Sequence, residues 1–507
     1  MNAIHERSVP LWSSAIPDFP SLTEDTTADV AVVGAGIAGL SSAYELARDG
    51  LAVVVLDRGR PAGGMTGRTT AHLATTFDNS YARLIRDRGV DVAKGYCASQ
   101  CAALDRIEAI IAAEAIDCDF RRLDAYTIAV QDEDRKYLQE ELEAYRSIGL
   151  TDVGWVDRAP LSGRDTGRCL RIANQGRYHP IKYAGGLIRG LLARTGRVFA
   201  NSAVVAIEED QTGVTVRTSS HAVRAKQVVV ATLSPVDARA GIHTKQTPIR
   251  TYVQAARVPR GTVADALFWD TADPYHYVRI QPDAEGDWLI FGGEDHRTGE
   301  VDDGAERQRK VEAWARGLFP ELGAVEYCWS GQIMEPIDHV GFIGRAAGTA
   351  RTFICTGDSG HGLTTATTAS LLLRDLIAGR DNPYVAVYDP ARPVTSALAG
   401  LGQEVAVYAR NLVARVLPGE NRSTDDVAPG EGAVVSEGGE KIAAYRDAAG
   451  VLHTRSAICS HMGCVVSWNS FERCWDCPCH GSHYAVNGRV LGGPAVAPLP
   501  IAPPRSR

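Results

Sequence analysis

The sequence predicts three structural parts: a Rossmann-like α/β domain, an antiparallel-sheet α+β domain inserted into it, and a small all-β domain at the C-terminus. Three observations lead to this prediction. A glycine-rich turn between a strand and a helix occupies residues 34–39. Short β runs separated by Asp/Gly turns lie between residues 236 and 328. Two boxes that interleave cysteine and histidine follow near the end of the chain, within a segment of small-domain size.

Length and composition agree with several domains. The chain has 507 residues, of which 45% are hydrophobic and 22% charged, enough for two or three folded units. Its net charge of -8 argues against nucleic acid as a partner. No apolar run reaches the length of a membrane span, so we expect no membrane partner. Residues 1–28 lack the basic start and apolar stretch of a signal peptide, which predicts a cytoplasmic protein.

The first glycine-rich turn has the context of a dinucleotide site. A strand, the turn, an alanine-rich helix and a second strand follow one another between residues 28 and 56. Gly34 permits the tight turn, Gly36 lets the backbone approach a pyrophosphate, and Gly39 lets helix and strand pack closely. Asp57 ends the second strand and can accept hydrogen bonds from an adenosine ribose. The pattern therefore predicts dinucleotide binding.

Three further stretches favour FAD over NAD. Residues 63–73 form a Gly/Thr-rich loop suited to wrapping a flavin, and residues 226–235 form a buried strand that passes the cofactor again. Residues 352–379 repeat the strand, glycine turn and helix, so their N–H groups can also face the flavin. The predicted FAD contacts are Gly34, Gly36, Gly39, Asp57, Arg58, Thr70, His72, Val204, Ala231, Gly357, Gly360, Gly362, Leu363 and Thr364.

Candidate substrate-binding groups lie on two predicted strands of the inserted domain. Tyr277 and Arg279 alternate with His276, so they share one face of a strand while His276 points the other way. Arg250 begins a neighbouring strand, and an arginine facing the flavin would hold a carboxylate bidentately. The alternative is that Arg250 and Arg279 are surface or ion-paired residues.

Two histidines are further candidates. His361 lies in the second glycine turn and is expected to line the pocket, with a structural hydrogen-bonding role as the alternative. His72 lies in the Gly/Thr-rich loop, where it could carry a covalent flavin link. The predicted catalytic set is thus Arg279, Tyr277, His361 and Arg250.

The C-terminal boxes offer two thiolates and two imidazoles. This set suits a [2Fe–2S] centre in which Cys459 and Cys477 hold one iron while His461 and His480 hold the other. Zinc is the alternative, because Cys₂His₂ sets also bind zinc in small domains. Zinc spacing normally places a cysteine pair before a histidine pair, however, and does not interleave them in both boxes. The spacing therefore favours the iron–sulfur cluster.

These boxes resemble a known family. ICSHMGC, ending at Cys464, and CPCHGSHY, ending at Tyr484, are similar to the two boxes of Rieske proteins, and the following Gly-Pro-Ala is similar to their proline loop. The resemblance implies that Ser482 and Tyr484 donate hydrogen bonds to cluster sulfurs and raise the reduction potential. Cys464 and Cys479 can bridge the two loops, and the resemblance favours the disulfide-bearing kind of Rieske domain.

Residues 28–390 resemble the glycine oxidase and D-amino-acid oxidase superfamily of FAD-dependent oxidoreductases. The resemblance rests on both glycine turns, on the strand ending at Ala231 and on Trp329-Ser330-Gly331 followed by Asp338. Joined to a C-terminal Rieske domain, the whole chain is similar to bacterial FAD/Rieske fusion oxidoreductases.

The resemblance implies an enzyme. We expect FAD to take a hydride from the C–N bond of an amine, N-methyl or amino-acid-type substrate, while the Rieske centre passes electrons singly to an external acceptor, which can be a protein. The alternative is a redox-sensing or electron-transfer flavoprotein without an amine substrate, in which the Rieske domain is regulatory. A Rieske oxygenase would also need a mononuclear iron site, and no following domain supplies one.

The predicted domain plan is discontinuous, because the substrate domain interrupts the flavin domain twice. The expected parts are an N-terminal arm (1–27), the FAD-binding domain (28–117, 180–235 and 329–385), the substrate domain (118–179 and 236–328), a helical linker (386–424) and the Rieske domain (425–507).

Overall fold

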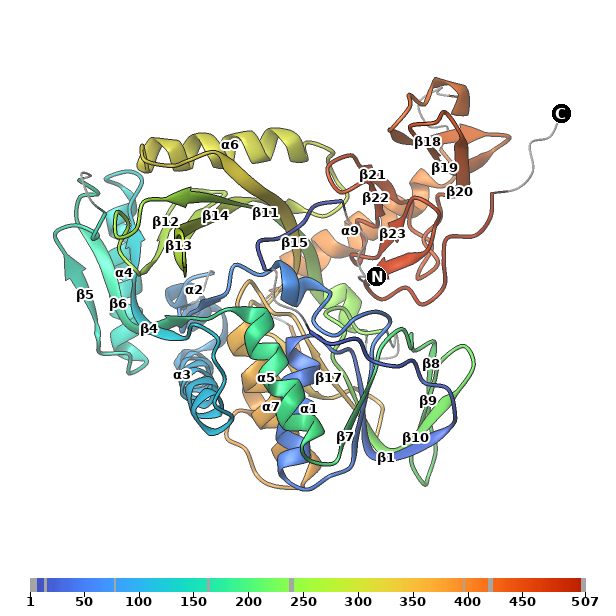
Figure 1. The fold of residues 1–507 in the computed structure, drawn as a ribbon, viewed down its shortest axis with the longest axis horizontal. Coiled ribbons are helices and arrows are strands. Elements are labelled where there is room, and N and C mark those ends of the chain that lie inside the picture. The colour runs from blue at the N-terminus through green and yellow to red at the C-terminus, as the bar shows by residue number, and fades with distance from the viewer. Residues whose placement is uncertain are drawn as a thin grey trace.

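The computed structural model describes residues 7–12, 16–76, 79–161, 165–236, 241–394, 397–417 and 423–502. The expected arm, linker and Rieske domain each extend into residues outside these ranges: 1–6 and 13–15, 395–396 and 418–422, and 503–507 respectively. Residues 77–78, 162–164 and 237–240 of the two larger expected domains also lie outside the described residues. The domain boundaries stay predictions. Figure 1 shows the arrangement of the described elements.

The predicted Rossmann-like α/β fold is confirmed by a mainly parallel sheet. Its central strand β1 (Thr26–Val33) pairs in parallel with β2 (Val53–Leu56) on one side and β10 (Ala222–Val230) on the other. The inner ends of these strands are fully buried runs of Val, Ala and Leu, as expected for strands covered on both faces. The sheet also contains β7 (Gly196–Phe199), β8 (Ala206–Glu209), β9 (Val214–Arg217), β16 (Phe342–Arg345) and β17 (Thr352–Thr356).

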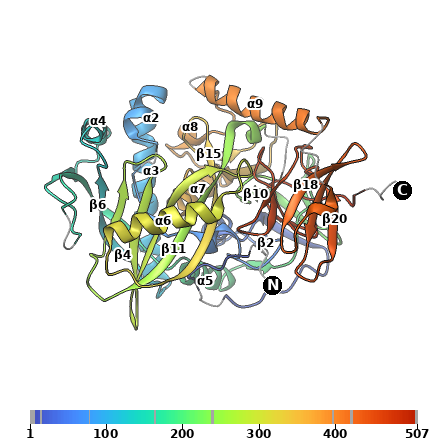
Figure 2. The same ribbon diagram turned by 90° about the horizontal axis from the view of Figure 1, so that it is seen from above.

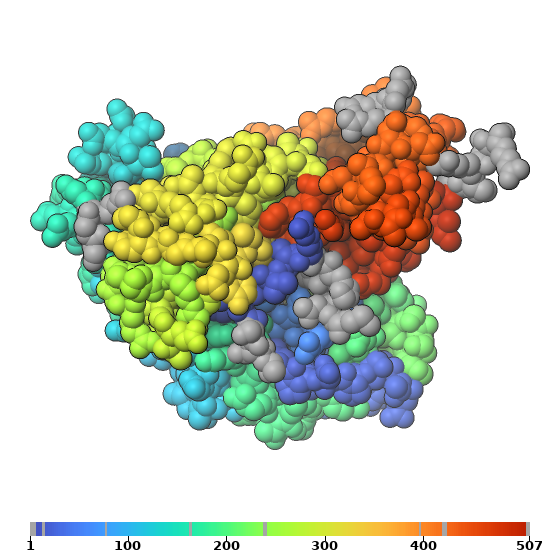
Figure 3. Space-filling view, turned by 45° about the horizontal axis from the view of Figure 1, so that its top comes forward, coloured from blue at the N-terminus to red at the C-terminus, as the bar shows by residue number. Residues whose placement is uncertain are grey.

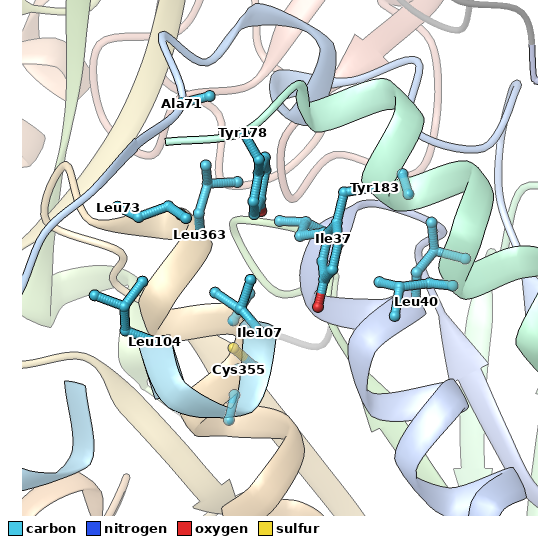
Figure 4. Close-up of a cluster of buried hydrophobic side chains, with 14 of the residues drawn as sticks. Ile37, Leu40, Ala71, Leu73, Leu104, Ile107, Tyr178, Tyr183, Cys355 and Leu363 are labelled. Carbon is cyan, nitrogen blue, oxygen red and sulfur yellow. The ribbon is translucent and has the colours of Figure 1, made fainter. Parts of the chain in front are cut away.

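Helices α1 (Ile37–Arg48), α5 (Pro180–Leu192) and α7 (Gly362–Ile377) pack together against this sheet, and α3 (Val90–Ala113) packs beside α7 (Figure 1). The start of α1 lies close to the strand because Gly39 has no side chain: a Cβ there would come within 1.8 Å of the Gly34 carbonyl oxygen. Above the helices, Figure 4 shows Tyr178 and Tyr183 between Leu363 and Leu40, their rings stacked with centroids 4.7 Å apart. The core thereby fixes both helices whose N-termini follow glycine turns.

A second, nine-stranded sheet stands beside the first. The strands in spatial order are β15 (Val325–Pro336), β11 (Gln246–Val258), β14 (Gly286–Arg297), β13 (His276–Asp283), β12 (Leu267–Asp270), β4 (Arg121–Ile128), β6 (Cys169–Arg177) and β3 (His72–Leu73), with β5 (Val153–Val156) paired to β6. Every pairing is antiparallel except that of β12 with β4. Helix α6 (Gly304–Leu318) lies over β11 in Figure 2 and also packs on β14. Helices α2 (Tyr81–Arg88) and α4 (Asp134–Ser147) pack on each other.

The C-terminal domain is small and all-β, as predicted. One sheet consists of β18 (Gly432–Glu437), β19 (Glu440–Arg446) and β20 (Leu452–Ser456), and the other of β21 (Ser467–Asn469), β22 (Cys474–Asp476), β23 (His483–Ala485) and β24 (Val490–Gly492). Both are antiparallel. The Trp468 and Trp475 rings, 4.9 Å apart, form its core beside the cysteine boxes.

Two segments connect this domain to the rest of the molecule. Helix α9 (Leu398–Ala414) runs along it, and Glu404 on this helix forms an ion pair with Arg297 of β14. The N-terminal segment lies in the seam between the yellow and orange-red regions of Figure 3, where Ser8 donates to Glu472 with an Oγ–Oε1 distance of 2.6 Å. None of the helices in the described part of the chain combines the length and apolar composition needed to span a membrane.

At this seam, Glu472 of the C-terminal domain contacts both the N-terminal segment and the flavoprotein part. Its side chain is fully buried and accepts hydrogen bonds from Arg68 Nη1 at 3.2 Å and from Ser330 Oγ at 2.5 Å. Burial raises the pKa of this carboxyl, but Arg68 and Arg250 outweigh burial and leave the pKa below its usual value. Glu472 is therefore a charged group that only the docked domain arrangement can satisfy.

We expect Glu472→Ala to lower the free energy of unfolding by about 3–5 kcal/mol, because it leaves Arg68 buried without its counter-charge. Urea unfolding followed by circular dichroism measures this change. The matched control is Glu440→Ala, which removes an exposed carboxylate of the same domain and should change stability by less than about 0.5 kcal/mol. Equal stability of the two variants would show that the seam is not a site of buried charge.

Candidate flavin cavity and iron–sulfur site

A cavity lies between the two glycine turns and the second sheet. Most predicted FAD contacts line it: Gly34, Gly36, Asp57, Arg58, Thr70, His72, Val204, Ala231, Gly357, Gly360, Gly362 and Leu363. Gly39 and Thr364 lie outside the lining. Gly39 serves the packing of α1, and the Thr364 hydroxyl donates to the His361 carbonyl at 3.3 Å. The structure thus gathers segments from the whole first domain around one elongated space.

The first glycine turn fits the pyrophosphate of a dinucleotide. Gly34 has φ +103°, and a Cβ there would meet the Ala231 carbonyl oxygen at 2.4 Å. The first turn of α1 carries no acidic residue, so its positive dipole end is free for phosphate. Asp57 holds the turn in place by accepting from Ala35 N at 2.6 Å and Gly59 N at 2.8 Å. Backbone shape and charge here suit FAD.

The second glycine turn joins β17 to α7. Gly357 and Gly360 have φ of +79° and +78°, and His361 occupies the N-cap position of α7. Asp358 lines the cavity and accepts from Met334 N at 2.9 Å; burial raises its pKa to about 6. The turn therefore brings backbone, an imidazole and a carboxylate to the same side of the cavity.

Two of the predicted catalytic residues reach the cavity. Tyr277 lines it, and its hydroxyl lies 2.8 Å from Thr251 Oγ1. His361 lines it from the opposite domain. His276 faces away, stacking on Trp314 of α6 with ring centroids 4.6 Å apart, as strand alternation predicts. Tyr277 and His361 are thus brought together around one space.

The two arginines are a correction. Arg250 is fully buried and donates to Asp476 at 2.9 Å and to Ser330 Oγ at 2.6 Å. Arg279, equally buried, donates from Nε to the Thr70 carbonyl at 2.6 Å, and burial lowers its pKa to about 9. Neither belongs to the cavity lining. Both guanidinium groups are committed to internal partners, so the expectation that they hold a substrate carboxylate was wrong.

The four predicted iron ligands meet in the C-terminal domain. The rings of His461 and His480 have centroids 5.0 Å apart, and burial lowers their pKa values to about 4 and about 3, so both are neutral at pH 7. Contact with Cys477 and the Tyr484 hydroxyl lowers the pKa of Cys459 to about 6, although burial opposes this. Neutral imidazole and thiolate are the forms that bind iron.

Unpaired buried atoms support the cluster. Both ring nitrogens of His461 and Nδ1 of His480 are buried without a hydrogen-bond partner among the described residues. Such groups are costly unless a ligand satisfies them, and a [2Fe–2S] cluster does so. Tyr484 Oη lies 3.0 Å from Cys459 Sγ, where the resemblance to Rieske proteins expected it. The predicted disulfide between Cys464 and Cys479 is confirmed.

Sequence reasoning missed how the flavoprotein part covers the histidine side of the cluster site. His243, in the 3₁₀ turn Ile242–Lys245, is buried with its ring centroid 4.6 Å from that of His461 and 5.5 Å from that of His480. The ring centroid of Tyr408 of α9 lies 6.0 Å from that of His480. Within the described chain, the ligand imidazoles therefore contact side chains of the same molecule rather than an open surface.

Sequence reasoning also missed a wall shared by the two sites. His483, Leu491, Gly492 and Gly493 of the C-terminal domain line the flavin cavity. Gln332, another lining residue, donates to the Gly481 carbonyl at 3.1 Å, one residue beyond the ligand His480. No local pattern could reveal this, because the wall joins segments far apart in the chain. The cavity and the cluster loop thus meet across one layer of side chains.

The cysteines that bind the cluster and the cysteines that form the disulfide should respond differently to substitution. Cys459→Ser or Cys477→Ser should abolish the cluster, reducing iron from about two atoms per chain to near zero. Cys464→Ser or Cys479→Ser keeps all four ligands, so we expect iron to remain while stability falls by about 3 kcal/mol or the potential shifts. Iron analysis and EPR of the dithionite-reduced proteins measure both. Equal iron loss in all four variants would overturn the assignment.

Comparisons with known proteins agree with this geometry. Residues 29–376 match the family described as FAD dependent oxidoreductase, and residues 420–503 match the Rieske [2Fe-2S] domain. The Bacillus subtilis protein YhfW, described as a Rieske 2Fe-2S iron-sulfur protein, is 30% identical over 494 residues, covering 96% of each chain. Gamma-glutamylputrescine oxidoreductase of Escherichia coli is 29% identical over 379 residues, 71% of this chain and 86% of that one.

The solved structure of glycine oxidase from Geobacillus kaustophilus shares the fold, with a TM-score of 0.62 and 19% identity over 72% of this chain and 99% of that chain. The two family matches fall on the two structural parts that hold the glycine turns and the cysteine boxes. An FAD site and a [2Fe–2S] site therefore coexist in one polypeptide. The chain belongs to the FAD dependent oxidoreductase family and carries a C-terminal Rieske [2Fe-2S] domain.

Proposed function

We propose that this oxidoreductase oxidises the C–N bond of a small amine, N-methyl or amino-acid-type substrate by hydride transfer to FAD, and that electrons leave singly through the Rieske cluster to an external acceptor. The observation that carries the proposal is the wall shared by the flavin cavity and the cluster loop. When bound, FAD supplies two-electron chemistry and the cluster supplies one-electron chemistry. The protein's own residues must then bind and orient the substrate.

Several residues of the cavity lining suit a cationic substrate. Tyr275, Tyr277 and Trp269 provide aromatic surface against which a small substrate can pack. Asp295 and Asp358 contribute carboxylates to the lining, and with a pKa of about 6 Asp358 is mainly ionised at pH 7. Negative charge beside aromatic rings favours an amine.

The placement of the arginines refines the substrate class. Arg250 and Arg279 are outside the lining. Of the two arginines that line the cavity, Arg68 is paired with Glu472, and Arg58 donates to the Ala495 carbonyl at 3.3 Å. A substrate carboxylate would therefore find little positive charge beside Tyr277, which favours an amine over an α-amino acid. The names of two similar proteins, gamma-glutamylputrescine oxidoreductase and glycine oxidase, support this general class of C–N substrates. A cytoplasmic location is part of the proposal.

Anaerobic mixing with candidate substrates tests the reaction. Primary and secondary amines, N-methyl compounds and amino acids are added separately, and flavin absorbance is followed. We expect an amine to bleach the flavin faster than the amino acid that carries the same side chain. Tyr277→Phe and Asp295→Asn should each slow bleaching, about tenfold or more where a contact of about 1.4 kcal/mol is lost. If no C–N compound bleaches the flavin, the protein is a redox sensor or carrier.

A second prediction concerns electron exit. Rieske centres lie at about -150 to +300 mV, so electrons run downhill from flavin to cluster. We expect His480→Ala or Cys477→Ser to leave flavin reduction by an active amine intact. The same variants should lose turnover with one-electron acceptors, while oxygen still reoxidises the flavin slowly. The control is Cys474→Ser, which changes a buried cysteine outside the ligand set.

Steady-state assays with ferricyanide and with oxygen, each beside a rapid-mixing measurement of flavin reduction, separate the two steps. Wild-type turnover of the ligand variants with every acceptor would place the cluster off the electron path, and the Rieske domain would then be structural or regulatory.

A further inference from the structure

A buried ring nitrogen of His483 in the shared wall has no hydrogen-bond partner among the described residues. His483, three residues after the ligand His480, is 2% exposed and lines the flavin cavity. Its Nδ1 lies 2.6 Å from Asp476 Oδ1, whereas its Nε2 is buried and, among the described residues, forms no hydrogen bond. A buried imidazole nitrogen left unpaired is costly, which points to a group that the cavity receives.

Asp476 influences which ring nitrogen of His483 carries the hydrogen. Its carboxylate is buried and also accepts from Arg250 Nη2 at 2.9 Å and Asn469 Nδ2 at 2.8 Å. Asp476 Oδ1 lies 2.6 Å from Nδ1, closer than Arg250 Nη2 at 3.2 Å, so the short contact favours the tautomer with its hydrogen on Nδ1. In this tautomer Nε2 is an acceptor.

We propose that His483 Nε2 accepts a hydrogen bond from a hydroxyl group of bound FAD, so that the Rieske domain supplies part of the flavin-binding site. FAD has such donors on its ribityl chain and its adenosine ribose, whereas its phosphates only accept. Gly492 and Gly493 bring backbone from the same domain to the cavity. Gly493 is needed there because its φ is +87° and a Cβ would meet the Gly481 carbonyl oxygen at 2.5 Å.

The hydrogen-bonded pair of His483 and Asp476 links the two cofactor sites. Asp476 directly precedes the cluster ligand Cys477, and Arg250 of β11 anchors it to the flavoprotein part. A hydroxyl bonded to His483 is therefore connected to the cluster loop through two side chains. His483 thus acts as a cofactor-binding residue contributed in cis by a domain that has its own cofactor.

The test uses His483→Asn in the full-length holoprotein. An asparagine Nδ2 can replace the Nδ1 donor to Asp476 but provides nothing at the position of Nε2. We expect FAD affinity to fall about threefold to tenfold, the loss of one hydrogen bond, with iron content and the EPR signal of the reduced cluster unchanged. Fluorescence of released FAD, measured over a dilution series, gives the dissociation constant.

The matched control is His453→Asn, because His453 also pairs with an aspartate, Asp447, in the same domain, and neither residue belongs to the cavity lining. It should leave FAD affinity unchanged. If His483→Asn does not fold, His483→Gln, which retains an acceptor near Nε2, is compared with His483→Met, which does not. The glutamine variant should bind FAD more tightly than the methionine variant.

Two results would overturn the proposal. Wild-type FAD affinity in His483→Asn, or equal affinity of the glutamine and methionine variants, would show that Nε2 makes no bond to the cofactor. Loss of the cluster signal with FAD affinity unchanged would mean that His483 serves only the cluster loop through Asp476. Both readouts are independent of any amine substrate, so they remain decisive if the proposed reaction is wrong.

Discussion

Two arginine–carboxylate pairs, Arg250 with Asp476 and Arg68 with Glu472, lie buried between the flavoprotein part and the Rieske domain. Separating the domains would leave four charges without these partners, and docking them elsewhere would bury charges unpaired. Such pairs add little net stability compared with apolar contacts, but they permit very few arrangements. The relative position of the two domains is therefore set by charge pairing, and the shared cavity wall depends on it.

Fixed docking matters because the two cofactors handle electrons differently. A flavin takes two electrons from a C–N bond, while a [2Fe–2S] cluster carries one. Joining both in one chain gives the flavin a nearby outlet at high effective concentration. His243 and Tyr408 cover the histidine side of the cluster site, so that side is engaged within the molecule. In the proposed function, this side would receive electrons from within the molecule.

The sequence predicted what depends on local spacing. Gly34, Gly36 and Gly39 have conformational and packing requirements that leave a pattern, and so do Cys459, His461, Cys477 and His480. The roles of Arg250 and Arg279 could not be assigned in this way. The sequence pattern around an arginine on a strand is the same whether its side chain contacts a substrate or an internal partner such as Asp476. The roles of His243 and His483 were equally hidden, since they arise only where segments distant in sequence dock. Strand alternation was enough, in contrast, to place Tyr277 and His276 on opposite faces.

Residues of the Rieske domain form one wall of the FAD cavity. This wall can be tested by hydrogen–deuterium exchange of the holoprotein, compared with protein stripped of FAD but retaining its cluster. Residues 481–493 should exchange faster once FAD is removed, because their backbone borders the emptied cavity, while residues 432–456 of the same domain should not change. Unchanged exchange across residues 481–493 would contradict the account, since it would show that the two cofactor sites do not share a wall.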